Sequence, residues 1–300
     1  MLTIKRKDLA GIALLAKSVA DKRSSMPILG GVMLHGIAGD LVATATDLQV
    51  HCVATSPCDG ELDPVVVPAF LLAGIVNVQT VDTIGLEITG AGSAQRLVLR
   101  GGKGSMARMI TMRADDMPKP PKIVGEAASV EVGGEHLAEV LRRGILCAST
   151  DETKPFIHGV CFDAHDHVLS AVSTTGHTLA VVEIGPWAGS DGKWLVSLAG
   201  AKALLGIGDR GKCTLRFSPG SLGVEAAGVR MSIRLVDAEF VAWRKEIQLH
   251  RSDGGIRVRV GAGAFVEAIY RAQIVLDSRK GIALALKNEG IIAVSAEDPD

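Results

Sequence analysis

The sequence predicts an α+β protein built from repeated domains, each with two helices packed on antiparallel sheets. Short runs of alternating apolar residues, typical of strands, are interrupted by stretches with apolar residues at helical spacing. Four pairs of identical residues share one separation (155 − 27 = 128): Pro27 and Pro155, Gly31 and Gly159, Val32 and Val160, and Thr46 and Thr174. An interval of this length, kept without slippage, indicates duplication of a whole domain.

In the first repeat, the order of one strand, one helix and three strands is predicted to occur twice. Residues 2–5 alternate as a strand, and Asp8 is a candidate N-cap for a helix with apolar positions from Leu9 to Val19. A loop follows at residues 21–25. The remaining elements are expected as strands at 28–35, 41–46, 50–54 and 65–67, a helix at 69–78, and strands at 84–89, 96–99 and 105–112.

The segment 115–122 contains three prolines and lacks periodicity, so we expect an extended linker there and a domain boundary near residue 124. Predicted domains are therefore residues 1–124, 125–249 and 250–300, the third holding only the first half of a repeat. The second repeat is expected as a strand at 129–132, a helix at 137–145, a loop at 149–154, strands through 155–180 and at 194–196, a helix at 199–207, strands at 213–217, 223–226 and 229–235, and a turn-rich crossover at 237–244.

The third repeat begins again with the same phase. Phe265 follows Leu137 by the same interval (265 − 137 = 128) as Leu137 follows Leu9 (137 − 9 = 128). We expect a strand at 256–260, a helix through Phe265 and Ile274, and strands at 281–286 and 291–295.

Composition narrows the class of protein. Hydrophobic residues make up 47% of the chain and aromatic residues 3%, so aliphatic side chains must build the cores. A net charge of −1 excludes a protein that is basic all over but allows a local basic face. The five cysteines show no C-x-x-C spacing, which favours reduced thiols. Since we find neither a signal peptide nor a long apolar run, we expect a cytoplasmic protein without a membrane partner.

Three strings resemble catalytic or metal sites, but their context argues against them. Gly206–Cys213 fits G-x-x-x-x-G-K without the following Ser or Thr, and a helix precedes it where a phosphate-binding loop needs a strand. His165-Asp166-His167 suits a polar hairpin turn better than a metal site. Ser173, Thr174 and His177 lack a carboxylate partner for nucleophilic catalysis. We therefore expect no enzyme, no metal and no cofactor.

Basic residues recur on the expected helices. They are Lys7, Lys17, Arg142, Arg143, Lys202 and Arg271. Two interpretations stay open from charge alone: one positive lining formed by equivalent helices, or ordinary solvated helix faces.

Five strings, in this order, resemble the beta sliding clamp of bacterial DNA polymerase III over residues 1–300. They are R-S-S-M-P-I-L-G-G-V-M-L from Arg23, A-T-A-T-D-L from Ala43, S-T-D-E-T-K-P-F-I-H-G-V from Ser149, S-T-T-G-H-T-L-A from Ser173 and R-L-V-D-A-E-F from Arg234. The resemblance implies a DNA-clamp fold and a homodimeric ring around double-stranded DNA, with helices lining the hole. It implies a processivity factor in DNA replication that tethers DNA polymerase III subunits and has a clamp loader among its partners.

The resemblance also implies roles for particular residues. DNA-facing positions are Arg23, Thr150 and Lys154, with Arg142, Arg143 and Lys202 added from the helix lining. A partner-peptide pocket is implied at Ile157, Thr174, Gly176, His177, Leu179 and Val241. A dimer interface is implied at Met106, Arg108, Ile274 and Val275.

The chain departs from the family pattern at several of these positions. Thr175-Gly176-His177-Thr178 replaces the usual Asp-Gly-His-Arg, and Val241 replaces a usual proline. The second half of the third repeat is not found before Asp300. An alternative expectation is therefore a clamp-like paralogue or decoy that binds clamp partners without closing a ring.

Overall fold

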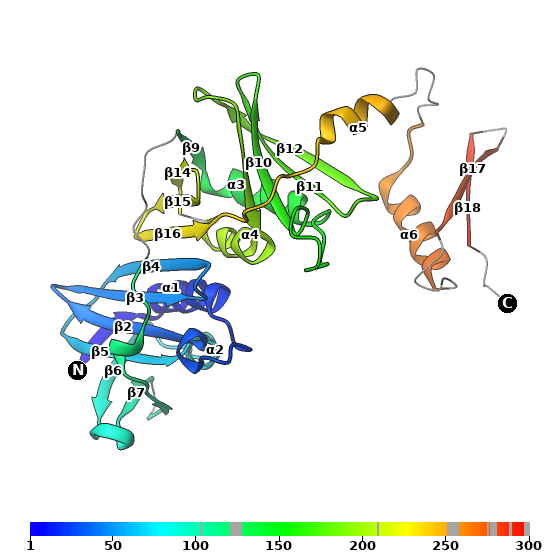
Figure 1. The fold of residues 1–300 in the computed structure, drawn as a ribbon. Helices are drawn as coiled ribbons and strands as arrows, with labels where there is room; N and C mark the ends of the chain where they lie inside the picture. The colour runs from blue at the N-terminus through cyan, green and yellow to red at the C-terminus, as the bar shows by residue number, and fades with distance from the viewer. Residues whose placement is uncertain are drawn as a thin grey trace. The chain divides into compact units, whose positions relative to one another are not determined.

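The computed structural model of the chain describes residues 1–102, 104–120, 128–208, 210–250, 258–274, 276, 281–287 and 290–296 (Figure 1). The chain forms two compact units, Met1–Val241 and Ala242–Asp300. The first unit contains both complete repeats.

Repeat one alternates helices with short antiparallel strands. Its elements are β1 (Leu2–Lys5), α1 (Arg6–Val19), the 3-10 turn η1 (Pro27–Gly30), β2 (Gly31–Ile37), β3 (Asp40–Thr46), β4 (Val50–Pro57), β5 (Leu62–Pro68), α2 (Ala69–Asn77), β6 (Thr83–Thr89), the 3-10 turn η2 (Gly92–Ala94), β7 (Arg96–Arg100), β8 (Met106–Ile110) and the 3-10 turn η3 (Ala114–Asp116).

Repeat two has the same order of helices and strands. They are β9 (Ser129–Gly133), α3 (Gly134–Ile145), β10 (Gly159–His165), β11 (Val168–Thr174), β12 (Leu179–Pro186), β13 (Gly192–Ser197), α4 (Leu198–Leu204), the 3-10 turn η4 (Leu205–Ile207), β14 (Lys212–Ser218), β15 (Ser221–Ala226) and β16 (Val229–Arg234). Helix α1 begins at Arg6 and α3 at Gly134, so the predicted interval is confirmed (134 − 6 = 128).

The strands of the first unit form three antiparallel sheets. Four-stranded sheets have the orders β1-β6-β7-β8 and β12-β11-β10-β13, and an eight-stranded sheet has the order β5-β2-β3-β4-β16-β15-β14-β9. Strands β4 and β16 join the two repeats in the eight-stranded sheet, with Val50 opposite Ile233 and Ala54 opposite Val229. The repeats are therefore joined by backbone hydrogen bonds as well as by the linker. The predicted α+β class, with two helices on antiparallel sheets in each complete repeat, is confirmed.

One hydrophobic core runs through both repeats. It extends from Leu2 to Ile233 and includes the buried face of α1, at Leu9, Ile12 and Leu15. Helix α1 contacts α2 and α4, and α4 contacts α3, so the four helices form one packed layer. In repeat two the core holds a cluster of rings, in which Trp194 and Phe217 have centroids 4.5 Å apart.

The linker and the residues just before it are anchored to repeat one. Met112 N donates to Val66 O at 2.8 Å, and Val66 N donates to Met112 O at 3.3 Å. Met117 is buried with Ile28, Leu29 and Val66. The prediction of an extended linker from residue 115 is wrong at its start, where η3 forms; Pro121 and Lys122 lie outside the described residues.

Four further predictions of local structure need correction. Residues 28–30 form η1, because Pro27 fixes a helical φ at the start of the turn. Asp8 is not the N-cap: α1 begins at Arg6, and Asp8 lies in its first turn. The crossover at 237–244 ends in a helix, α5 (Trp243–His250). Residues 258–260 form no strand, and residues 256–257 lie outside the described part.

The second unit also contains α6 (Ala262–Gln273) and the hairpin β17 (Ala283–Lys287) and β18 (Ile291–Ser295). Helix α6 begins at Ala262, one further interval after the start of α3 (262 − 134 = 128), so the third repeat of the phase is confirmed. The boundaries at residues 124 and 249 stay predictions. None of the described helices is long and apolar enough to cross a membrane.

Candidate functional site

Exposed basic side chains lie along the packed layer of helices. Lys7 and Lys17 project from α1, Arg142 and Arg143 from α3, and Lys202 from α4. Their helices contact one another through α4, while the apolar faces of the same helices are buried in the core. A shared layer of exposed cations suits a polyanion, because long basic side chains can reach phosphates without fixed geometry.

Adjacent arginines on α3 differ in their partners. Arg143 makes an ion pair with Glu139, one helical turn earlier. Arg142 makes no ion pair with the described residues and lines a hollow of about 520 Å³ with Glu135, Glu139, Leu205 and Gly208. Arg142 is therefore freer than Arg143 to contact a ligand.

A second basic cluster surrounds Phe70 of α2. The Nζ atoms of Lys17 and Lys22 each lie 5.8 Å from the centre of its ring. Arg23 is exposed in the same loop as Lys22, and its backbone N–H donates to Asp21 Oδ1 at 2.8 Å. Sequence reasoning missed Lys22 and Phe70 because only the fold brings α2 beside this loop.

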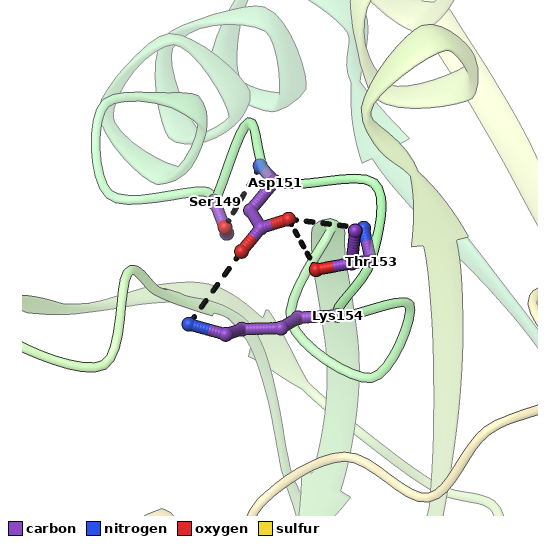
Figure 2. Close-up of polar contacts among 4 residues, drawn as sticks. All are labelled: Ser149, Asp151, Thr153 and Lys154. Carbon is purple, nitrogen blue, oxygen red and sulfur yellow. Dashed lines mark hydrogen bonds and ion pairs between the residues drawn. The ribbon is translucent and has the colours of Figure 1, made fainter.

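The loop Ser149–Lys154 is ordered by its own side chains (Figure 2). Asp151 Oδ1 accepts hydrogen bonds from Thr153 N at 3.0 Å and Thr153 Oγ1 at 2.6 Å, and Asp151 N donates to Ser149 Oγ at 3.1 Å. Lys154 Nζ lies 3.5 Å from Asp151 Oδ2. The hydrogen bonds from Thr153, helped by Lys154, lower the pKa of the Asp151 carboxyl. Thr150 and Lys154 are exposed on this loop.

The turn between β11 and β12 repeats the turn between β3 and β4. Asp47 Oδ1 accepts from Gln49 N at 2.9 Å and Val50 N at 2.5 Å. Thr175, at the equivalent position of repeat two (175 − 47 = 128), accepts from His177 N at 3.2 Å and Thr178 N at 3.1 Å through Oγ1. The threonine hydroxyl therefore preserves the turn without the carboxylate charge.

The remaining predicted pocket residues come from this turn, from the segment before β10 and from the end of the first unit. Thr174 is buried and pairs with Leu179, the first residue of β12, which is half-buried. Gly176 adopts φ +93°, in the left-handed region that favours glycine, and His177 is exposed. Two other positions were predicted with them: Ile157 is buried, and Val241 is half-buried.

Both parts of the predicted dimer interface are surface features. Met106 and Arg108 are exposed on β8, the edge strand of its sheet. Ile274, which follows α6 in the second unit, is 84% exposed. Val275 lies outside the described residues.

Comparison with known families identifies both repeats. Residues 1–121 match the model of the DNA polymerase III beta subunit N-terminal domain, and residues 131–241 match the model of its central domain. The chain belongs to the beta sliding clamp family. The family resemblance inferred from the sequence strings is thereby confirmed.

Individual clamp proteins are distant in sequence and alike in fold. The chain is 24% identical to the beta sliding clamp of Vibrio cholerae, over 93% of this chain and 75% of that protein. The crystal structure of a Pseudomonas aeruginosa DnaN sliding clamp bound to griselimycin has a TM-score of 0.81 at 22% identity, covering 99% of this chain and 80% of that one. The DNA polymerase III beta subunit of Thermotoga maritima gives 0.78 at 22% identity, over 98% and 83%.

The strings that resemble catalytic sites have structural roles in this clamp family member. Ser173 is buried, and its hydroxyl donates to the carbonyl of Gly144. His165-Asp166-His167 forms the predicted hairpin turn, with positive φ at Asp166 and His167. The Gly206–Cys213 string follows a helix and enters β14 as expected; its Asp209 lies outside the described residues.

One acidic neighbour of the hairpin turn was not foreseen. Asp191 Oδ2 lies 2.8 Å from His165 Nδ1, and Asp166 Oδ2 lies 3.3 Å from His165 Nε2. The three groups lie close enough to hold a metal ion, but both imidazole nitrogens already face carboxylates on an exposed turn. We interpret the group as a polar cluster on the surface.

Proposed function

We propose that this protein acts as a DNA sliding clamp, a processivity factor that encircles duplex DNA as a homodimer and tethers DNA polymerase III subunits. Loading by a clamp loader, a cytoplasmic location and the absence of catalysis belong to the same proposal. The observation that carries it is the layer of exposed cations on contacting helices in a chain of the beta clamp family.

Double-stranded DNA would be held through its phosphates. We assign contacts to the helix residues Arg142, Arg143 and Lys202, and to the loop residues Arg23, Thr150 and Lys154. All six are exposed, so they can reach phosphates with little rearrangement. Phosphate contacts carry no sequence information, and this permits sliding along any sequence.

The polymerase would be held through one of its own peptide segments, bound at the predicted partner-peptide pocket. We assign Ile157, Thr174, Gly176, His177, Leu179 and Val241 to it. Tethering raises the effective concentration of the polymerase at the template without a new contact to DNA. Because Thr175 and Thr178 are uncharged, we expect the peptide to be selected by apolar side chains and backbone hydrogen bonds.

Ring closure would join the edge strand β8, at Met106 and Arg108, to the region of Ile274 and Val275 in a second copy. An unpaired edge strand offers backbone donors and acceptors for such pairing.

Retention on circular DNA tests the proposal. The protein is loaded on a nicked circular plasmid with a clamp loader and filtered through a sizing column, before and after the plasmid is cut once. We expect retention on the circle and release from the linear form. Equal release from both forms contradicts encirclement. A protein that captures polymerase peptides but is never retained would be the paralogue or decoy.

A further inference from the structure

A cavity of about 380 Å³ lies where the repeats join in the eight-stranded sheet. Its polar lining comprises His51 from β4, Arg216 from β14, Glu225 from β15, and Arg230 and Ser232 from β16. Residues that alternate with these along the strands, such as Cys52 and Ile233, belong to the core. The cavity therefore opens on the sheet face turned away from the core and from the cation layer on the helices.

Two features of the sequence create the cavity on this face of the sheet. Gly223 stands between Ser232 and Arg216 in the row of paired residues, so the row lacks one side chain. Pro120 forms part of the wall, and the segment before it is held on repeat one by Met112 and Met117. The cavity is therefore bounded by both repeats and by the linker.

A buried imidazole with one unpaired nitrogen atom lines this cavity. His51 is only 4% exposed, and its Nε2 atom is buried without a hydrogen-bond partner in the described part of the chain. Burial lowers the pKa of this histidine, which favours the neutral ring. A neutral imidazole can donate one hydrogen bond, and buried polar atoms of native proteins are nearly always paired.

The charges around His51 leave one cation uncompensated. Arg216 Nη1 lies 2.8 Å from Glu225 Oε1, so that pair is internally balanced. Arg230 makes no ion pair or side-chain hydrogen bond with any residue that the structure describes. Its planar guanidinium matches the oxygens of a carboxylate or phosphate, and Ser232 supplies a further hydroxyl. The apolar wall at Val53 and Pro120 would contact the body of a ligand.

We propose that this cavity is a binding site for a small organic anion. The carboxylate or phosphate group lies between Arg230, Ser232 and His51, and an apolar part lies against Val53 and Pro120. The volume falls within the range of about 300–1,000 Å³ that is typical of small-molecule sites. The site is independent of the DNA-facing helices and would place a ligand across the joint between the repeats.

Titration with two probes tests the site on the full chain. Phenyl phosphate and benzoate share an apolar ring and differ in the anion, and the assigned ring resonances of His51 report occupancy by NMR. We expect a saturable shift of these resonances with at least one probe. A response to one probe alone identifies the anion as phosphate or carboxylate.

Two arginine variants of the same strand separate binding from general charge. Arg230→Gln removes the proposed ligand contact, and we expect roughly tenfold weaker binding from loss of a charge-assisted hydrogen bond. Arg234→Gln removes an exposed arginine of β16 that does not line the cavity, and we expect unchanged binding. Both residues are exposed, so melting curves should confirm folding. The proposal would be overturned if neither probe gave a saturable shift. It would also be overturned if the two variants weakened probe binding equally.

Discussion

The adjacent arginines of α3 offer a sharp test of DNA contact by the helix layer. Arg142 and Arg143 are both exposed, but only Arg143 is paired with Glu139. Replacing each in turn by glutamine removes one charge from the same turn of one helix. If the helix layer holds DNA through phosphates, the unpaired arginine should contribute more.

The size of each expected effect follows from phosphate neutralisation and from the ion pair between Arg143 and Glu139. A cation that neutralises one phosphate adds about 0.9 to the slope of log affinity against log salt concentration. Exposed pairs one helical turn apart are worth roughly 0.3–0.5 kcal/mol, or about a twofold change in binding. We therefore expect Arg142→Gln to lower the slope by about 0.9. The loss of DNA affinity in Arg143→Gln should be about twofold smaller than the loss in Arg142→Gln. Glu139→Gln should strengthen DNA binding about twofold or more, because it frees Arg143.

Fluorescence anisotropy with a labelled duplex, measured at several salt concentrations, gives both affinity and slope. Arg234→Gln, which changes an exposed arginine on a strand, controls for net charge. An unchanged slope in Arg142→Gln would refute contact between this helix face and phosphates. A larger loss from Arg143→Gln than from Arg142→Gln would refute the argument from the Glu139 pair.

Three further predictions concern stability and reactivity. Thr175→Asp should melt within about 1 °C of the parent, since Asp47 makes the equivalent turn, whereas Thr175→Ala should lose about 1 kcal/mol, seen as a fall of a few degrees in calorimetry. Burial lowers the pKa of His51 in the folded chain, so as pH falls His51 takes up a proton in the unfolded chain before it does so in the folded chain. The free energy of unfolding should therefore drop below about pH 6.5. Denaturant titrations should show a smaller drop in His51→Asn. A thiol reagent at pH 8 should modify at most two cysteines before denaturation and five after it. Rapid modification of three or more cysteines in the folded protein would contradict the burial of the other three thiols. The half-buried thiols are Cys58 and Cys147, and the buried ones are Cys52, whose pKa burial raises to about 12, Cys161 and Cys213.

Periodicity predicted most of the fold because each repeat alternates strands and helices that have one buried face. The constant interval between repeats located equivalent helices, and α1, α3 and α6 begin at that spacing. Local chemistry was less reliable at the ends of elements. Helix α5 escaped prediction because Asp237, Ala238 and Glu239 suggest turns and its own length is only eight residues.

The candidate site depends on contacts that a sequence does not display. Positions of Arg142 and Lys202 on helices were predictable, but the pairing of Arg143 with Glu139 needed side-chain geometry. Phe70 and Lys22 come together through packing of α2 against α1. His51 gave no signal, because its isolation arises only where β4 meets β16.

The pairing of β4 with β16 also bears on how the chain can be divided. A fragment that ends in the linker would leave β4 as a bare edge, with Val50 and Val53 beside unpaired backbone donors and acceptors. The complementary fragment would expose β16 in the same way. Such edges recruit any available strand, so separated repeats should aggregate or rejoin when mixed, and only the covalently continuous pair should remain monodisperse.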